Sequence, residues 1–261
     1  MTGPARRRAH AKLTLGLRVT GVRDDGYHLI DAEMVSLDLH DVITITPHPT
    51  PHSETAGTIT VSGPFAHGVP TDGSNLVARA LRLVRGSADV EIEKLIPHGG
   101  GLGGGSTDAA TILRWGGFGT DVEDLRRASA LGADIPFCLV GGRARVRGIG
   151  ELVDQLPHVD RDITLVIPPL QVSTPAAYRA WDDLGGPRAD GPNDLEPAAI
   201  AVEPRLAWWR DAIAERAGLP PVLAGSGATW FVEGRRDNAL GDLVDEGARV
   251  VATHTVAAPF G

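Results

Sequence analysis

The residues best suited to chemistry form a glycine-rich run between an expected strand and an expected helix. Residues 97–110 read Pro-His-Gly-Gly-Gly-Leu-Gly-Gly-Gly-Ser-Thr-Asp-Ala-Ala. Glycines permit positive φ angles and let a ligand approach backbone amides closely. The unpaired amides and the dipole of a helix N-terminus attract anions. The run therefore predicts a phosphate cradle. Ser106, Thr107 and Asp108 are expected to cap the helix or form its first turn, and a hydroxyl of this group could face phosphate or Mg²⁺.

Two other interpretations of this run compete with the cradle. A flexible linker is disfavoured, because a strand pattern precedes the run and a helix pattern follows it. The spacing Gly99-x-Gly101-x-x-Gly104 satisfies the dinucleotide-binding fingerprint, but it follows a proline and no regular βαβαβ pattern continues from it. A Walker-type loop is absent from the sequence, because no Gly-Lys-Ser/Thr follows the glycines.

Lysine usage gives a second chemical signal. Among the 25 cationic residues only Lys12 and Lys94 are lysines. An ammonium is a compact point charge that a planar guanidinium replaces poorly. The two lysines are therefore candidates for positions that need such a charge, although each could also be a solvated strand residue.

Composition restricts the class of protein. The chain has 261 residues, of which 42% are hydrophobic and 22% charged, a composition typical of a soluble protein. Its net charge of −8 disfavours a nucleic-acid partner. Its single cysteine, Cys138, excludes an internal disulfide and a cysteine-rich metal site, and its apolar surroundings predict a buried, inert thiol. No secretory signal and no run of about 18 apolar residues is seen, and the histidines lack metal-ligand spacing. We expect a cytoplasmic protein without a membrane partner.

The elements that must position these residues follow from hydrophobic periodicity. Strands are expected at 9–22, 32–46, 59–61, 90–96, 163–167, 229–233 and 249–255. Helices are expected at 75–84, 107–115, 122–131, 175–182, 204–217 and 237–247. Strands and helices are mixed without strict alternation, which favours an α+β fold with two lobes. The boundary is expected at 155–162, giving domains 1–157 and 158–261.

The order of several short motifs resembles the GHMP kinase superfamily. Pro97, Gly101-Leu102-Gly103 and Ala109-Ala110 match the superfamily's second motif, and the doubled glycine triplet is similar to that of the diphosphocytidyl-methylerythritol kinases. Further segments match that family in order, at 11–13, 20–28, 75–80, 132–136, 148–151, 173–175, 193–196 and 225–228. Each match is short, but together they run from residue 9 to 233.

The resemblance implies a fold and a reaction. The fold is a ribosomal-protein-S5-like N-terminal lobe with a ferredoxin-like C-terminal lobe. The reaction is phosphorylation of the 2-hydroxyl of 4-diphosphocytidyl-2-C-methyl-D-erythritol, dependent on ATP and Mg²⁺, in non-mevalonate isoprenoid synthesis. Such an enzyme would act on a small molecule as a monomer or weak homodimer. Two alternatives stay open: a GHMP kinase for another alcohol (a sugar, homoserine or a mevalonate-type compound), and a non-catalytic nucleotide-binding protein.

The resemblance also implies the catalytic residues. Asp134 would accept the proton of the attacking hydroxyl, and Lys12 would neutralise charge on the transferred phosphoryl group and favour the ionised form of Asp134. Without the resemblance, Asp134 reads as a turn or helix-capping acid. No protein ligand to a metal is predicted.

The remaining site residues fall into two groups. The nucleotide group comprises Asn75, Leu76, Lys94, Pro97, Gly99, Gly100, Gly101, Leu102, Gly103, Gly104, Gly105, Ser106 and Thr107. The substrate group comprises Thr14, Tyr27, His28, Thr174, Pro175, Tyr178, Gly225 and Ser226. Tyr27 and Tyr178 could sandwich a base, although Tyr27 also reads as a turn-packing aromatic and His28 as a surface histidine. Thr14 departs from the family, which often has asparagine there, and His98 is an unusual residue in the loop.

Overall fold

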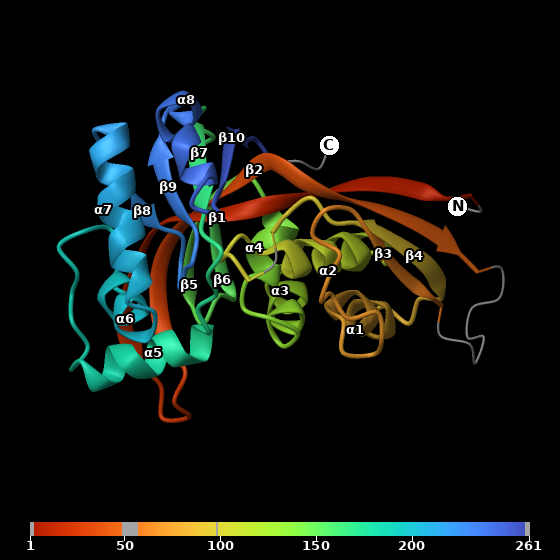
Figure 1. Cartoon of the computed structure of the whole chain (residues 1–261). Coiled ribbons are helices and arrows are strands. Elements are labelled where there is room, and N and C mark those ends of the chain that lie inside the picture. The colour runs from red at the N-terminus through yellow and green to blue at the C-terminus, as the bar shows by residue number, and fades with distance from the viewer. Residues whose placement is uncertain (1–2, 49–56, 98, 259–261) are drawn as a thin grey trace.

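Two long antiparallel strands, β1 (Ala5–Val22) and β2 (His28–Pro47), form the spine of the computed structural model (Figure 1). The structure describes residues 3–48, 57–97 and 99–258. The turn between the two strands contains Gly26, whose φ of 85° suits glycine. Strand β2 pairs with β1, β4, β5 and β10 along different parts of its length, so it organises the whole sheet.

The first part of the chain adds four strands and four helices to this spine. In chain order they are β3 (Ile59–Ser62), α1 (Leu76–Leu83), β4 (Ala88–Glu93), α2 (Gly104–Trp115), α3 (Val122–Ser129), α4 (Ile135–Val140), β5 (Arg143–Gly148) and β6 (Leu152–Leu156). Strand β3 pairs with β4 in parallel, and the other ladders are antiparallel. Helix α2 contacts α1, α4 and β1, which places it in the centre of this part (Figure 1).

The second part of the chain builds a smaller sheet beside the first. Its elements are β7 (Asp162–Ile167), α5 (Thr174–Asp183), α6 (Glu196–Val202), α7 (Arg205–Ala217), β8 (Val222–Leu223), β9 (Trp230–Glu233), α8 (Asp237–Leu240), the 3₁₀ helix η1 (Gly241–Val244) and β10 (Arg249–Val256). Strand β10 pairs with β7 from Arg249 to His254 and with β2 at Thr255 and Val256. The last strand therefore joins the two sheets.

Among the described residues the hydrophobic core has three clusters, and the one that joins the two parts most extensively draws on both sheets. It contains Leu13, Val35 and Leu102 from the first part and Leu165 and Phe231 from the second. The predicted α+β class with two lobes is confirmed. The division at 157/158 stays a prediction, because this shared cluster and β10 tie the lobes together.

Several predicted elements differ from the structure at their ends. The strand expected to reach Ile96 ends at Glu93, because a side-chain oxygen of Asp41 accepts the amides of Leu95 and Ile96. The helix expected at 237–247 is a short α8 followed by η1. The sequence analysis did not predict α4, α6, β5, β6 or β8.

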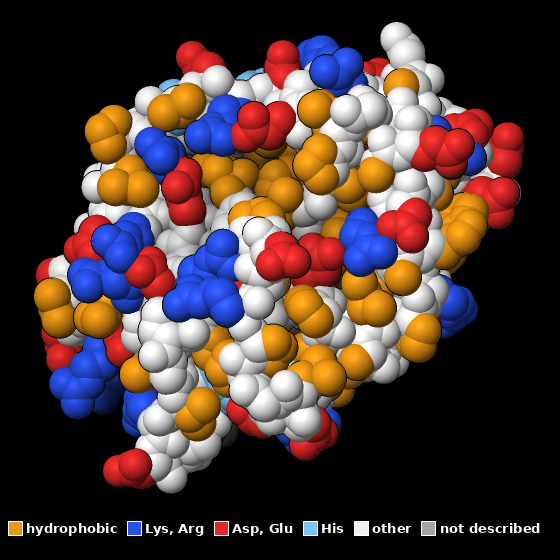
Figure 2. All heavy atoms as spheres, turned by 90° about the vertical axis from the view of Figure 1, so that its left-hand side faces the viewer, with side chains coloured by type: hydrophobic (Ala, Val, Ile, Leu, Met, Phe, Trp, Pro, Cys, Tyr) orange, Lys and Arg blue, Asp and Glu red, His pale blue; other side chains and the backbone are white. Residues whose placement is uncertain are grey.

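The face formed by the helical side of the second lobe carries both signs of charge (Figure 2). Cationic and anionic side chains alternate there with small apolar patches. On α7, for example, Arg210 contacts both Glu196 and Asp211. Within residues 3–48, 57–97 and 99–258, none of the helices has the length and apolar composition of a membrane span.

Candidate active site

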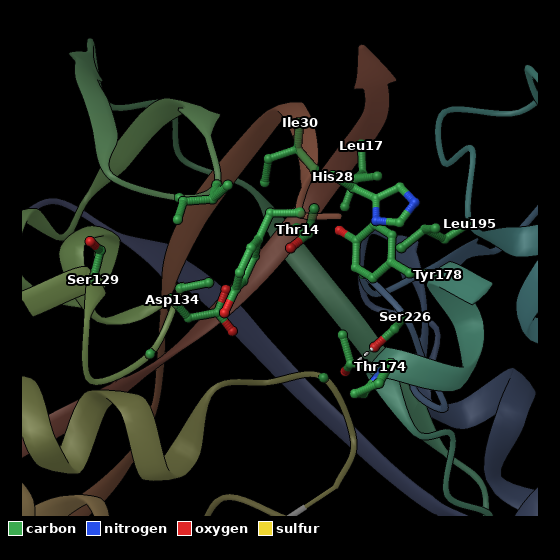
Figure 3. Close-up of a pocket in the computed structure, with 18 of the residues that line it drawn as sticks. Thr14, Leu17, His28, Ile30, Ser129, Asp134, Thr174, Tyr178, Leu195 and Ser226 are labelled. Atoms are coloured by element: carbon green, nitrogen blue, oxygen red, sulfur yellow. Dashed lines mark hydrogen bonds between the residues drawn. The ribbon is translucent and has the colours of Figure 1, made fainter. Parts of the chain in front are cut away.

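A cleft of about 910 Å³ opens between the two lobes. Its walls come from β1, the start of β2, the loop before α4, helix α5 and the turn at 225–226 (Figure 3). Both predicted catalytic residues and all eight predicted substrate residues line it: Lys12, Asp134, Thr14, Tyr27, His28, Thr174, Pro175, Tyr178, Gly225 and Ser226. From the nucleotide group, Gly101 and Ser106 line the same cleft.

Helix α2 starts three residues earlier than the sequence pattern predicted. Gly103 is its N-cap, in the left-handed conformation with φ of 69°, and no side chain caps the helix. Ser106, Thr107 and Asp108 therefore lie inside the helix. None of them is the N-cap, whereas the alternative of a first-turn position is correct for Ser106. The first turn consists of Gly104, Gly105 and Ser106. Because this turn has neither a side-chain cap nor an acidic residue, its amides can receive an anion.

The glycine loop packs so tightly that side chains would not fit at Gly101 or Gly103. A Cβ atom on Gly101 would lie 2.5 Å from the carbonyl oxygen of Ala224, and one on Gly103 would lie 2.6 Å from Cγ of Lys12. Both glycines also have positive φ. The amide of Lys12 donates to the carbonyl of Leu102 at 3.0 Å. The loop is therefore held directly against β1 and the second lobe.

Lys12 and Asp134 form the charged centre of the cleft. Nζ of Lys12 lies 3.3 Å from Oδ2 of Asp134 and donates to Oγ1 of Thr14, also at 3.3 Å. The β1–β2 pairing shifts register between His10 and Lys12. Lys12 is 5% exposed, whereas the side chain of Asp134 is 33% exposed. The carboxylate can therefore meet a substrate while the ammonium lies behind it.

Aromatic and polar groups gather at the far end of the cleft. The rings of His28 and Tyr178 stack with centroids 4.6 Å apart (Figure 3). Nε2 of His28 hydrogen-bonds to Oδ1 of Asp182 at 2.8 Å. Thr174, Tyr178 and Asp182 are four residues apart on α5 and so share one face. Burial, and then the charge of Asp134, raise the pKa of the Tyr178 phenol, which keeps it neutral.

Tyr27 occupies a different environment from Tyr178. It is 60% exposed, and the guanidinium of Arg23 lies 5.9 Å from its ring centroid. The structure thus pairs Tyr178 with His28 rather than with Tyr27. A base held between Tyr27 and Tyr178 stays a prediction.

The turn at Gly225–Ser226 is held in place by buried polar groups. The side-chain amide of Asn193 donates to the carbonyls of Leu223 and Gly225, at 2.8 and 2.7 Å. The hydroxyls of Ser226 and Thr174 lie 2.8 Å apart, which links the turn to the start of α5 (Figure 3). Asn193 belongs to a matched motif, but the sequence analysis gave it no role.

The other predicted nucleotide residues do not line this cleft. The side chain of Asn75 accepts from the amide of Val77 and caps α1, and Leu76 is the first residue of that helix. Pro97, Gly99, Gly100, Leu102, Gly103, Gly104, Gly105 and Thr107 form or flank the glycine loop. His98 lies outside the described residues. Lys94 was expected either to bind the nucleotide or to be an exposed strand residue, and the second alternative is wrong because Lys94 is buried.

Three charged residues of the cleft were not selected from the sequence. Arg23, Arg179 and Asp182 line it. Arg23 lies within the matched segment 20–28, and Asp182 follows Tyr178 by one helical turn. Those positions were the available signals, but only the tertiary structure brings the three residues to one cleft.

Two further predictions concern the thiol of Cys138 and the protein ligands of a metal ion. Cys138 is buried in α4, and burial together with the charge of Asp134 raises the pKa of its thiol, so the prediction of a buried thiol is confirmed. In the part of the chain that the structure describes, no group of three or more His, Cys, Asp or Glu residues could hold a metal ion.

Comparison with known proteins gives consistent similarities. The profile of the GHMP kinases N terminal domain matches residues 75–142. The 4-diphosphocytidyl-2-C-methyl-D-erythritol kinase of Paracoccus denitrificans is 39% identical over 245 residues, covering 87% of this chain and 85% of that protein. A crystal structure of 4-(cytidine 5'-diphospho)-2C-methyl-D-erythritol kinase aligns with a TM-score of 0.75 and 29% identity, covering 97% of this chain and 100% of the other. A homoserine kinase from Cytophaga hutchinsonii, at 16% identity and a TM-score of 0.63, covers 95% of this chain and 94% of the other and shares the fold.

Proposed function

Because the chain belongs to the 4-diphosphocytidyl-2-C-methyl-D-erythritol kinase family of GHMP kinases, we propose that it transfers the γ-phosphoryl group of ATP to the 2-hydroxyl of that diphosphocytidyl alcohol. The reaction belongs to the non-mevalonate route to isoprenoid precursors. The observation that carries the proposal is the Lys12–Asp134 pair on a cleft that also reaches the uncapped N-terminus of α2.

Phosphoryl transfer depends mainly on positioning and on neutralisation of charge. Asp134 is exposed enough to accept a hydrogen bond from the acceptor hydroxyl. It takes the hydroxyl proton as that oxygen bonds to the γ-phosphorus of ATP and the bond from this phosphorus to ADP, the leaving group, breaks. Lys12 lies beside that carboxylate and stabilises the negative charge that spreads over the phosphoryl oxygens. Thr14 orients the ammonium through its hydrogen bond.

The glycine loop fits the phosphates of ATP. Three residues without bulky side chains begin α2, and their amides lack a side-chain cap. For Mg²⁺, the suitable groups facing the cleft are the hydroxyl of Ser106 and the carboxylate of Asp134, together with the phosphates themselves. When bound, the ion neutralises phosphate charge.

The far end of the cleft supports the cytidyl acceptor over a smaller alcohol. A nucleobase needs flat partners and directional hydrogen bonds, which Tyr27, Tyr178 and His28 supply. Arg23 and Arg179 add positive charge that complements a diphosphate. A GHMP kinase for homoserine or a mevalonate-type alcohol has no need of these groups.

Two further properties complete the proposal. The enzyme works in the cytoplasm, where ATP is supplied, and it acts as a monomer or weak homodimer. Sedimentation at several protein concentrations tests the second property directly.

A coupled assay of ADP release tests the function. Wild-type protein with ATP and Mg²⁺ is offered the cytidyl alcohol, homoserine, mevalonate and a panel of sugars. We expect turnover with the cytidyl alcohol, lost in Asp134→Asn. Turnover with another alcohol instead would refute the acceptor assignment while keeping the kinase chemistry, and ADP release without any acceptor would refute both.

A further inference from the structure

Lys94 is buried in a charged cluster outside the cleft. It is 2% exposed, and its Nζ donates to Oδ2 of Asp108 at 2.7 Å and to Oδ2 of Asp41. Asp41 lies on β2 and Asp108 on α2, and both are buried. The cluster thus connects β2, the end of β4 and α2 through one buried ammonium.

The cluster lies directly behind the phosphate loop. A Cβ atom on Gly104 would be 3.1 Å from Nζ of Lys94, whereas one on the preceding Gly103 would contact the side chain of Lys12. The two lysines of the chain therefore lie on either side of the first residues of α2. Lys12 faces the cleft, and Lys94 supports the same turn from behind.

The cluster also fixes the chain as it enters the loop. Oδ1 of Asp41 accepts the amides of Leu95 and Ile96, at 2.5 and 2.8 Å, and so ends β4 at Glu93. The first glycine of the loop, Gly99, follows Ile96 by three residues. Lys94 consequently couples the entry of the loop, through Asp41, to its exit into α2, through Asp108.

Charge balance indicates a function beyond packing. Two carboxylates share one ammonium, and Oδ1 of Asp108 accepts no hydrogen bond from the described residues. Burial raises the pKa of Asp108 to about 7, although Lys94 opposes the rise. Burial alone would lower the pKa of Lys94, but the two carboxylates raise it, so the lysine stays cationic. Replacing a buried charged cluster by apolar side chains often leaves the stability of a protein unchanged. The hydrogen bonds of this cluster, in contrast, hold both ends of the glycine loop.

We propose, on the basis of the function given above, that Lys94 is a positioning residue: held by Asp41 and Asp108, it sets the conformation of the glycine loop that binds the nucleotide phosphates. It acts through the loop and does not touch the nucleotide. Lys94 therefore supports the nucleotide site indirectly, without the adenosine-side contact that the family resemblance implies.

A matched pair of variants at Asp108 tests this role. In Asp108→Asn the side-chain oxygen can still accept a hydrogen bond from Lys94. In Asp108→Leu the new side chain has a similar size but no acceptor, and Lys94 keeps only its ion pair with Asp41, which has no net charge. The probe is the ATP analogue AMP-PNP, titrated calorimetrically with Mg²⁺ and without acceptor, so the test is independent of acceptor identity. We expect Asp108→Leu to weaken binding by about ten- to hundredfold, the range seen when supporting partners of a site are removed, and Asp108→Asn to stay within a factor of about three of wild type.

Two controls separate positioning from loss of stability and from direct contact. Thr111→Val changes another buried polar residue of α2, one that bonds only within the helix, and should leave affinity unchanged. The double variant Lys94→Met/Asp108→Leu, in which Asp41 keeps its two amide donors, should bind as weakly as Asp108→Leu alone. Wild-type affinity in Asp108→Leu overturns the proposal, and so does a double variant that binds far more weakly than Asp108→Leu, because Lys94 would then contact the nucleotide itself.

Discussion

Nζ of Lys12 and Oδ2 of Asp134 lie 3.3 Å apart, with the lysine buried and the carboxylate open to the cleft. Lys12 belongs to β1, and Asp134 immediately precedes α4, so the tertiary fold creates the pair. In the proposed reaction this ion pair would hold a base beside the acceptor hydroxyl and a cation beside a phosphate.

The pair should behave as a unit in a double-mutant cycle. Lys12→Met and Asp134→Asn are each expected to lower kcat by about 10²- to 10⁴-fold, the usual contribution of a positioned acid or base. The double variant should be little worse than the poorer single one. Steady-state kinetics and thermal unfolding of the three variants give the answer. Glu33→Gln, which breaks the remote Arg143–Glu33 ion pair, is the control and should keep normal turnover, and near-normal turnover in either single variant would contradict the assignment.

Gly103→Ala should impair activity more than stability alone explains. The new methyl group would lie 2.6 Å from Cγ of Lys12, and the alanine would have to adopt the positive φ of Gly103. Gly117→Ala is the matched control, because Gly117 also has positive φ but has nothing within 4 Å of its Cβ position. Both variants should lose about 1–2 kcal/mol of unfolding free energy from the strained backbone, measured by urea denaturation. Only Gly103→Ala should lose kcat, so equal kinetics in the two variants would show that Lys12 tolerates the displacement.

Asp182→Ala should weaken binding of the acceptor and leave binding of ATP unchanged. Asp182 fixes the ring of His28, which stacks on Tyr178. Losing one hydrogen bond of this kind costs about 0.5–1.5 kcal/mol, or roughly two- to tenfold in the acceptor KM. Asp160→Ala removes a similar bond at 2.8 Å from His158 on the surface and should change neither KM. A rise in the KM for ATP with Asp182→Ala would place the aromatic end in the nucleotide site instead.

Stability should depend on pH through Asp108. Its folded-state pKa is raised from 3.8 to about 7 by burial, so between these values the carboxyl is protonated in the folded chain and ionised in the unfolded chain. The folded state therefore binds more protons, and its contribution to stability falls as the pH rises from about 4 to 7. Asp108→Asn, which stays neutral, should be more stable relative to wild type at pH 8 than at pH 5 in urea titrations. An identical pH profile for the two proteins would mean that Asp108 does not titrate in this range.

The sequence was sufficient for the local features. Alternating and helical periodicity located most of the strands and helices, because each burial pattern repeats within a few residues. The glycine run between strand and helix indicated a phosphate loop, and the scarcity of lysine singled out Lys12 and Lys94. The order of short motifs identified the family without any information on tertiary contacts.

The tertiary structure decided what lies next to what. Nothing local to Asp41 or Asp108 indicates that both bind Lys94, because that contact joins β2, the end of β4 and α2. The end of β4 at Glu93 has the same origin, since the side chain of Asp41, which is distant in sequence, accepts the amides of Leu95 and Ile96. Asp182 likewise became a site residue only when α5 placed it against His28. Local periodicity fixes which segments form, whereas long-range packing and the pairing of buried polar groups determine which side chains work together.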